Sequence, residues 1–291
     1  MNELRDTVRA VLRRHPGQAW EKLCAEVGVT GLAIPEEHGG AGAGLPEVHA
    51  VLEELGRDLT PHRLHGTTLA SQALLQAGDT RWLKRIADGS VTAALALDGE
   101  PYTLDAPGAD VVVASHNGRL YEATVTRSCT ALDESRALGV VEPDLTRPIG
   151  SANAGRLREI ACVLLSAEQV GAAARALEIT VEYTKTRVQF GRPIGAFQAL
   201  QHRMADLHVA VEAARAVSRA AVAGQAHPSV AKVVCSETLM RVAGEMIQLH
   251  GGIGITWEHS AHRYFKRAHG SWHLYGTPDA HVKRLAAARL D

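Results

Sequence analysis

The sequence lacks an excess of charge of either sign. Its 31 lysines and arginines nearly balance its 32 aspartates and glutamates, which leaves a formal net charge of −1. A chain of this kind does not present the strongly basic surface that attracts nucleic acids or anionic membranes. We therefore expect neither of these partners.

Long apolar runs are also missing. Residues 1–23 alternate charged and apolar side chains, so they contain no uninterrupted apolar segment of the kind found in secretory signals. No later stretch approaches the length of a membrane-spanning segment. These two absences predict a soluble, cytoplasmic protein.

Cysteines are few and far apart. Cys24, Cys129, Cys162 and Cys235 form neither a C-x-x-C pair nor a cluster with the spacing of zinc ligands. We predict that they are reduced and mostly buried thiols, and we predict no metal site.

The chain does have enough apolar content for a large core, because 46% of its 291 residues are hydrophobic. In residues 1–89 the apolar positions recur at helical spacing, with breaks at Pro35 and at Gly39–Gly40. Between 90 and 147 short β-prone runs replace them, and two of these runs flank Asn117–Gly118, a pair that favours a tight hairpin. The pattern predicts an N-terminal helical domain followed by a small β domain.

Residues 148–291 return to helical spacing. Apolar residues from Ile160 to Val181 recur at three- and four-residue steps, which predicts one long helix that ends near Gly191. We expect further helices over 197–223, over 229–249 and after Thr277, with a short helical turn at 261–269. Four antiparallel helices with short connections make a bundle. The predicted fold class is therefore mainly α with a small β unit.

Three segments carry motifs whose order and spacing are informative. They are Ile34–Gly40 (IPEEHGG) with Glu53–Arg57 (EELGR), Arg187–Ile194 (RVQFGRPI) with Phe197–Gln198, and Gln248–Thr256 (QLHGGIGIT) with Tyr275–Thr277 (YGT). Together they resemble the acyl-CoA dehydrogenase family over nearly the whole chain. The resemblance implies an N-terminal helical domain (1–89), a reduced middle β domain (90–147) and a C-terminal four-helix bundle (148–291).

The resemblance also implies a flavin cofactor. In this family the R-x-x-F-G and Q-x-x-G-G elements hold the ADP half of an FAD whose ring is bound by the neighbouring subunit. The cofactor-binding residues implied here are Arg187, Phe190, Gln198, Gln248, Gly251, Gly252 and Thr277. An arginine and exposed glycine amides suit a diphosphate, and an aromatic ring can pack on adenine.

Each of these residues also has a purely structural interpretation. Arg187 could stabilise the last carbonyls of a helix, Gly251–Gly252 could form a helix C-cap, and Phe190 could belong to the core. The joint spacing of the motifs favours contact with a flavin.

The sequence departs from the family at the catalytic base. Acyl-CoA dehydrogenation needs a carboxylate that takes the α-proton while the β-hydrogen leaves as a hydride. Most members place a glutamate directly before the G-T pair, but here Tyr275 precedes Gly276. Some relatives carry the glutamate on the long helix, where the corresponding residue is Ala161. We therefore predict no catalytic residue in this chain.

Three other groups are candidates for an unorthodox base. Glu159 lies two residues before Ala161, about 200° around the helix and thus on its opposite face. Asp279 falls in the first turn of the last helix, where acids often serve the helix dipole. His273 is one of fifteen histidines, so its presence alone means little.

A second departure lies in the middle domain. The family usually has an acidic, glycine-rich segment and a tryptophan-containing strand around the flavin ring. Here only Leu97–Pro101 matches a fragment, and no tryptophan occurs between 90 and 147. We expect a full-length acyl-CoA dehydrogenase partner, in an α2β2 heterotetramer, that holds the flavin ring, the base and most of the acyl-CoA.

This layout resembles the paired dehydrogenases that actinobacteria use on CoA thioesters derived from sterols. Two alternatives stay open. The chain could be a self-sufficient homomeric dehydrogenase with an unorthodox base, or a scaffold of the same fold that is not an enzyme.

Overall fold

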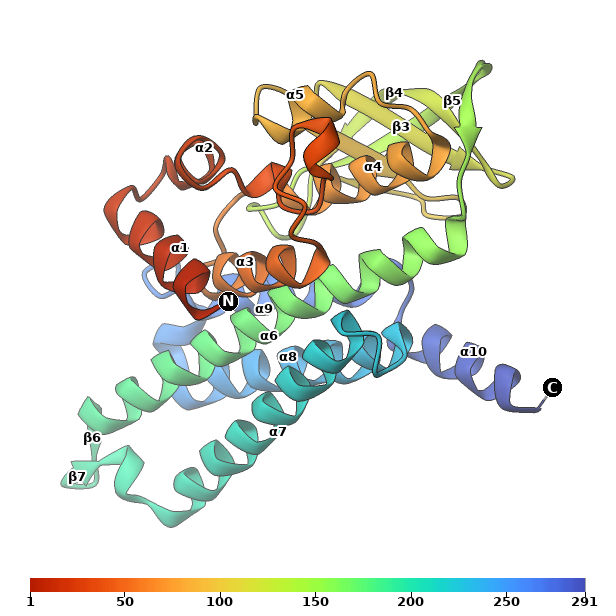
Figure 1. The fold of residues 1–291 in the computed structure, drawn as a ribbon. Helices are drawn as coiled ribbons and strands as arrows, with labels where there is room; N and C mark the ends of the chain where they lie inside the picture. The colour runs from red at the N-terminus through yellow and green to blue at the C-terminus, as the bar shows by residue number, and fades with distance from the viewer. Residues whose placement is uncertain (291) are drawn as a thin grey trace.

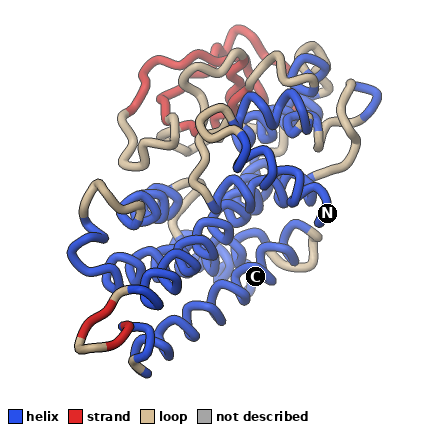
Figure 2. The backbone as a smooth tube through the Cα atoms, turned by 90° about the vertical axis from the view of Figure 1, so that its left-hand side faces the viewer, coloured by secondary structure: helices blue, strands red, loops and turns tan. Residues whose placement is uncertain are grey.

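The computed structural model describes residues 1–290, and these residues form two layers (Figure 1). One layer contains the N-terminal helices and the sheet, and the other contains the long helices of the bundle. Figure 2 shows the main sheet at one side of the molecule and the small hairpin β6–β7 far from it. The predicted fold class, mainly α with a small β unit, is confirmed.

Short helices and turns occupy most of residues 1–89. They are α1 (Asn2–Arg14), α2 (Ala19–Lys22), η1 (Leu23–Val27), η2 (Val29–Gly31), η3 (Glu36–His38), α3 (Leu45–Arg57), α4 (Leu64–Ala77) and α5 (Leu83–Ala87). The backbones of α3 and α6 (Ala154–Thr186) cross at very close range. A Cβ on Gly56 would lie 2.3 Å from the carbonyl oxygen of Glu168, and a Cβ on Gly171 would lie 1.9 Å from that of Glu53. Only glycine permits this approach, which explains the glycine of the EELGR motif.

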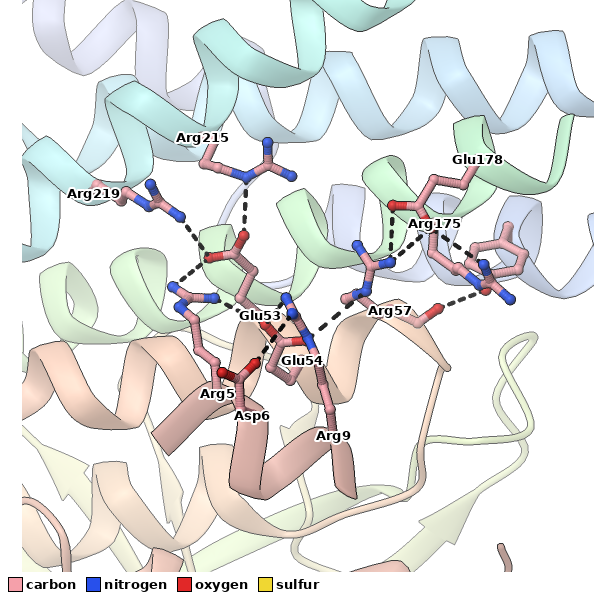
Figure 3. Close-up of polar contacts among 11 residues, drawn as sticks. Arg5, Asp6, Arg9, Glu53, Glu54, Arg57, Arg175, Glu178, Arg215 and Arg219 are labelled. Carbon is pink, nitrogen blue, oxygen red and sulfur yellow. Dashed lines mark hydrogen bonds and ion pairs between the residues drawn. The ribbon is translucent and has the colours of Figure 1, made fainter. Parts of the chain in front are cut away.

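The two glutamates of the same motif anchor α3 to its neighbours (Figure 3). Glu53 pairs with Arg5 of α1 at 2.7 Å and with Arg215 of α7 (Gln198–Val222) at 3.0 Å, while Glu54 pairs with Arg9 of α1 at 2.7 Å. Burial alone would raise the pKa of the Glu53 carboxyl, but Arg5 and Arg215 hold it below its ordinary value. The acidic pair therefore has a structural role.

The main sheet has the strand order β1–β3–β4–β5–β2. Its strands are β1 (Ala93–Ala96), β2 (Thr103–Leu104), β3 (Val111–His116), β4 (Arg119–Cys129) and β5 (Leu138–Ser151). Asn117 and Gly118 connect β3 to β4 with φ angles of +49° and +75°, so the predicted hairpin turn is confirmed. Because β5 continues to Ser151, the domain boundary expected at 147 falls inside a strand.

The bundle consists of α6, α7, α8 (Pro228–His250) and α9 (Ala261–His273). The long helix ends at Thr186, earlier than expected, because the chain turns there into the hairpin β6 (Val188–Gln189) and β7 (Arg192–Pro193), followed by η4 (Ile194–Ala196). The short helical turn expected at 261–269 is a 13-residue helix, α9. The last helix, α10 (Pro278–Leu290), projects from the bundle in Figure 1, so α9 is the fourth bundle helix.

Helix α6 belongs to two cores. Leu157 and Leu164 pack with the N-terminal helices and the sheet, whereas Ala172 and Leu177 pack with the other bundle helices. Its length and composition would allow α6 to cross a membrane, so the expectation that no stretch approaches such a segment was wrong. However, 94% of its most apolar window is buried inside the protein. The long apolar series reflects burial in both cores.

Candidate cofactor-binding site

The helix directions bring most of the predicted cofactor-binding residues to one end of the bundle. Arg187 follows α6, Gln198 begins α7, and Gln248 lies in the last turn of α8. Gly251 and Gly252 come directly after α8, in the turn η5 (Gly251–Ile255). We call this surface, residues 187–198 and 248–257, the hairpin end; its hairpin carries the β6 and β7 labels in Figure 1.

Thr277 lies at the other end of the bundle. Its carbonyl accepts the N–H of His281 at 3.1 Å, and the His281 ring lies 3.9 Å from the Cys162 sulfur in the first part of α6. The stretch of α6 from Cys162 to Thr186 is about 36 Å long at 1.5 Å per residue. Thr277 therefore does not join the other predicted residues in this chain. Its hydroxyl accepts the N–H of Ala280 at 3.4 Å at the start of α10.

The hairpin holds its side chains away from the bundle. Phe190 is 92% exposed and has a φ of +53°, in a two-residue turn with Gly191. A positive φ is unfavourable for a residue with a side chain, and exposure leaves the phenyl ring in water. Phe190 is therefore not a core residue, and its geometry indicates contact with something outside the chain.

Arg187 is also exposed. Its backbone N–H donates to the carbonyl of Tyr183 at 2.9 Å and closes α6, and its own carbonyl accepts the N–H of Ile194 at 2.8 Å. The guanidinium forms no ion pair with any residue that the structure describes. Gln198 and Gln248 are exposed as well. These long polar side chains are thus positioned by their backbones and available for an external ligand.

The turn after α8 offers open backbone. Gly251 has φ +61° and ψ −142°, a conformation for glycine alone. A Cβ on Gly251 or Gly252 would meet nothing within 4 Å. The space beside both residues is therefore open to a ligand, while the N–H of Gly251 itself donates to the carbonyls of Ile247 and Gln248.

A stack of three rings supports this turn. The His250 ring lies 4.3 Å from the Tyr183 ring and 4.2 Å from the His259 ring, and the Tyr183 hydroxyl donates to the His250 carbonyl at 3.3 Å. Burial lowers the pKa of His250, so the ring is neutral at pH 7. The stack connects the end of α6 to the end of α8 and fixes the position of Gly251.

The residues of the hairpin end fit the ADP half of an FAD. An unpaired guanidinium and an accessible glycine backbone suit the diphosphate, while the exposed ring of Phe190 suits adenine. Other apolar side chains on the same surface are exposed too, namely Val188 (54%), Ile253 (40%), Ile255 (73%) and Trp257 (70%). An apolar surface of this kind marks an interaction site.

The two positions at which the family carries its base, 275 and 161, hold no ionised group here. Tyr275 is 5% exposed and its ring stacks on His65, with 5.4 Å between ring centroids. Burial raises the pKa of Tyr275 well above 10, and the charge of Asp105 raises it further, so the phenol stays protonated. Ala161, at the alternative position, is fully buried and carries no acid.

The three candidates for an unorthodox base, Glu159, His273 and Asp279, form no polar or aromatic contact with the Tyr275 side chain in the part of the chain that the structure describes. Glu159 pairs with Arg156 at 3.1 Å and is 41% exposed. His273 is exposed beside His269, with 5.1 Å between rings, and Asp279 is exposed in the first turn of α10. Within residues 1–290, none of the three forms a hydrogen bond to Tyr275.

Sequence reasoning missed the buried carboxylate of Glu168. Its two oxygens bind His62 at 2.6 Å and Arg136, from the loop between β4 and β5, at 2.5 Å. Burial would raise its pKa, but Arg136 and His62 hold it well below the ordinary value. Glu168 is therefore a fixed ion-pair partner rather than a base. The polar pair Glu168–Gln169 inside an apolar helix was the available signal.

Asp105 is a second buried carboxylate that the sequence did not single out. One of its oxygens accepts the N–H of Gly66 at 2.9 Å in the first turn of α4. Burial raises its pKa, and the charge on Glu168 adds to this effect. Asp105 thus closes the start of α4, with the chain held there at a φ of +65°.

Known proteins resemble this chain over its whole length. A family model described as acyl-CoA dehydrogenase, N-terminal domain, matches residues 1–90, and one described as acyl-CoA dehydrogenase, C-terminal domain, matches residues 159–290. Acyl-CoA dehydrogenase IpdE2 of Mycobacterium tuberculosis is 45% identical, over 97% of this chain and 95% of that protein. The homologue of the same name from Mycolicibacterium smegmatis is 42% identical, over 98% of this chain and 97% of that protein.

Solved structures agree with the sequence comparison. The steroid ACAD Tcur3481-Tcur3483 matches with a TM-score of 0.88 and 28% identity, over 98% of this chain and 96% of that chain. The ChsE4-ChsE5 complex from Mycobacterium tuberculosis matches with a TM-score of 0.87 and 25% identity, over 100% of this chain and 97% of that chain. Both names join two different components.

Proposed function

The chain belongs to the acyl-CoA dehydrogenase family, and on this basis we propose that it is one subunit of a heteromeric, FAD-dependent dehydrogenase. A full-length acyl-CoA dehydrogenase partner supplies the contacts to the flavin ring, the base and most of the acyl-CoA site, in an α2β2 heterotetramer. This chain completes the partner's cofactor site with Arg187, Phe190, Gln198, Gln248, Gly251 and Gly252.

The exposure of the hairpin end carries this proposal. The Phe190 ring is 92% exposed at a positive φ, and its aromatic contact within the described chain is the edge of Phe197, with 6.2 Å between ring centroids. Arg187 lies three residues away with its guanidinium exposed. Both groups are suited to a ligand that arrives with a second protein chain.

FAD, when bound, supplies the hydride acceptor. Of this chain's own groups, Arg187 would hold the diphosphate beside the open turn at Gly251–Gly252, and Phe190 would pack on the adenine. The amides of Gln198 and Gln248 add directional hydrogen bonds. Because the cofactor then bridges two chains, cofactor retention and subunit association stabilise each other.

Proton abstraction is assigned to the partner because no carboxylate stands before Gly276. The nearest buried acids are committed to other contacts: Glu168 to Arg136 and His62, and Asp105 to Gly66. A base must be within hydrogen-bond reach of the proton that it takes. Within the described residues, no carboxylate occupies position 275 or position 161.

The proposed partner and substrate follow the relatives. The names of the matching structures describe a steroid ACAD and a complex of two proteins, and the chain covers nearly all of each matched component. We extend both properties to this chain. Its enzyme introduces a double bond between the α- and β-carbons of a sterol-derived acyl-CoA.

Co-expression tests the proposal. The chain is purified alone and together with a full-length acyl-CoA dehydrogenase from the same genome, and the flavin content and native mass are measured. We expect a colourless chain alone, and one FAD per pair of unlike chains in an α2β2 complex. A yellow, homomeric chain that oxidises an acyl-CoA would instead establish a self-sufficient enzyme.

The same preparation distinguishes the scaffold alternative. If the chain assembles with the partner but Arg187→Ala leaves the flavin content of the complex unchanged, the chain is a scaffold that does not touch the cofactor. Arg241→Ala is the matched control, since Arg241 is an exposed arginine in the middle of α8, away from the hairpin end.

A further inference from the structure

A cavity of about 280 Å³ lies beside α2, between the segment that joins α3 to α4 and the segment that joins β4 to β5. The Trp20 indole and the Pro61 ring form apolar walls, and the Trp20 ring lies 6.3 Å from the ring of His62. The cavity is separate from the hairpin end, because His62 contacts Glu168 on α6, and Glu168 lies about 27 Å before Thr186 along that helix. The polar residues of the lining are Glu21, Thr60, His62, Arg63, Asp105 and Ser135.

Asp105 is a buried acid without a positive partner. The residue is 4% exposed, and Oδ2 of its carboxyl group accepts the N–H of Gly66 at 2.9 Å. Oδ1 forms no hydrogen bond within residues 1–290, yet it is not one of the side-chain atoms that the fold seals from solvent. The carboxyl group also forms no ion pair in the described chain. A buried carboxylate is stable when a positive group pairs with it, so Oδ1 is an unused acceptor in the wall of the cavity.

Arg63 is a positive group without a negative partner. The residue is partly buried, and its Nη1 donates to the backbone carbonyl of Asp105 at 2.9 Å. Nε and Nη2 have no acceptor, and the guanidinium forms no ion pair, with any residue that the structure describes. The absence of a side chain at Gly108 gives the guanidinium room, since a Cβ there would lie 2.9 Å from Nη2. The carbonyl contact places Arg63 beside the Asp105 carboxyl group without neutralising it.

The other charged or basic groups of the lining are engaged or exposed. His62 accepts a backbone N–H at Nδ1 and donates from Nε2 to the Glu168 carboxylate at 2.6 Å, so the ring is neutral and both nitrogens are used. The Ser135 hydroxyl accepts from Arg267 at 2.6 Å and donates to a neighbouring carboxylate. Glu21 is exposed, and water and salt screen its charge. One buried acid and one arginine therefore remain for a ligand.

A ligand for this cavity needs three features. An ammonium group suits Oδ1 of Asp105, and a carboxylate suits the unpaired guanidinium of Arg63, since charged partners form the stronger hydrogen bonds. The two charges of the ligand must be close together, because the Arg63 guanidinium already contacts the backbone of Asp105. An apolar group completes the ligand, because the Trp20 and Pro61 rings offer it a surface away from water.

We propose that this cavity binds an α-amino acid with an apolar side chain. The ammonium group donates to Oδ1 of Asp105, the carboxylate accepts from Arg63, and the side chain packs on Trp20 and Pro61. The ligand has no net charge, so it pairs both groups of the protein without leaving an uncompensated charge in the cavity. The site is additional to the proposed cofactor site and does not depend on it.

Three ligands of similar shape test the proposal by calorimetric titration of the full chain at neutral pH. Leucine carries both charges, leucinamide lacks the carboxylate, and 4-methylpentanoate lacks the ammonium group. We expect leucine to bind saturably and at least about tenfold more tightly than either analogue, because each analogue loses one charged pair. Absence of saturable leucine binding, or equal binding by either analogue, overturns the proposal. Displacement of leucine by butyryl-CoA would assign the cavity to the thioester substrate and would also overturn it.

Two variants assign the contacts. Arg63→Gln should weaken leucine binding at least about tenfold and leave leucinamide binding unchanged, because leucinamide makes no charged pair with Arg63. Asp105→Asn keeps an oxygen that can accept the N–H of Gly66, and it should weaken leucine binding to a similar degree while sparing 4-methylpentanoate. Arg241→Gln, in the middle of α8, is the control and should bind all three ligands like the wild type. Unchanged leucine binding by either variant, at a wild-type melting temperature, overturns the proposal; the ligand series on the wild type decides it even if neither variant folds.

Discussion

The hairpin end lies at the C-terminal end of α6, whereas the surroundings of Tyr275 lie along its first half, and the polar groups of the two regions differ. Near Tyr275, the Glu168 carboxylate is enclosed by Arg136 and His62. At the hairpin end, Arg187 and Phe190 face outward. The position before Gly276 thus borders a buried ion-pair junction, whereas the exposed end carries groups suited to an external ligand.

The largest effect is expected at the junction. Glu168→Ala leaves Arg136 and His62 buried without their acceptor, and removal of one partner from a buried pair costs about 3–5 kcal/mol. Urea denaturation measures the free energy of unfolding. Glu182→Ala, which removes an exposed partner of Lys185 on the same helix, should change it by less than about 0.5 kcal/mol. A similar loss in the free energy of unfolding for the two variants would show that the contacts of Glu168 with Arg136 and His62 do not stabilise the fold.

Arg187→Ala should change cofactor retention but not folding. A hydrogen bond to a charged group contributes about 1.5–3 kcal/mol, so the complex should bind FAD about tenfold to a hundredfold less tightly. Flavin release on dilution, followed by absorbance, measures this loss, with Arg241→Ala as the control. If both variants retain flavin equally, the hairpin end has no part in the cofactor site.

The pH dependence of stability tests the burial of His65. Burial lowers its pKa to about 3, so below about pH 6.5 the unfolded chain binds a proton that the folded chain does not. Stability therefore falls as the pH drops from about 6.5 toward 3. His65→Phe keeps the stack on Tyr275 and should make this fall shallower by up to about 1.4 kcal/mol per pH unit. Urea denaturation of the wild type and of His65→Phe, measured from neutral to acidic pH, tests this prediction. Equal pH dependence of stability in the two proteins would contradict a lowered pKa for His65.

The smallest effect is expected for Tyr275→Phe in the assembled complex. The ring stack on His65 survives this change, and the phenol is protonated and has no assigned chemical role. Turnover of an acyl-CoA should stay within a few-fold of the wild type. A loss of turnover with unchanged flavin content would mean that the hydroxyl takes part in the reaction.

Much of the fold followed from periodicity, and its exceptions have physical causes. The α6 pattern was visible because its apolar face is nearly continuous, but its end was misplaced because Phe190 and Val188 look apolar in sequence and are exposed in space. The extent of α9 was underestimated because its buried apolar residues, Ala261, Tyr264 and Ala268, are separated by charged, histidine and other side chains. Spacing alone could not show which helix packs as the fourth member of the bundle.

In the candidate site, only the residues that belong to a family motif could be predicted from the sequence. Arg187 and Gly251 lie far apart in sequence, but the family motifs assign both to one site. The structure places both at one end of the bundle because α6 and α8 end there. Thr277 was grouped with them although its motif lies at the opposite end of α6. The Glu168–Arg136 pair was not accessible, because a lone arginine in the β4–β5 loop carries no local sign of a partner on α6.

Helix α6 also determines how the molecule can come apart. Because its first half is packed in one core and its second half in the other, loss of either core removes support from the same continuous hydrogen-bonded ladder. The glycine crossing at Gly56 and Gly171 adds a backbone contact at the middle of this helix. Its central amides should exchange with solvent only through global opening, so that the two layers behave as one cooperative unit.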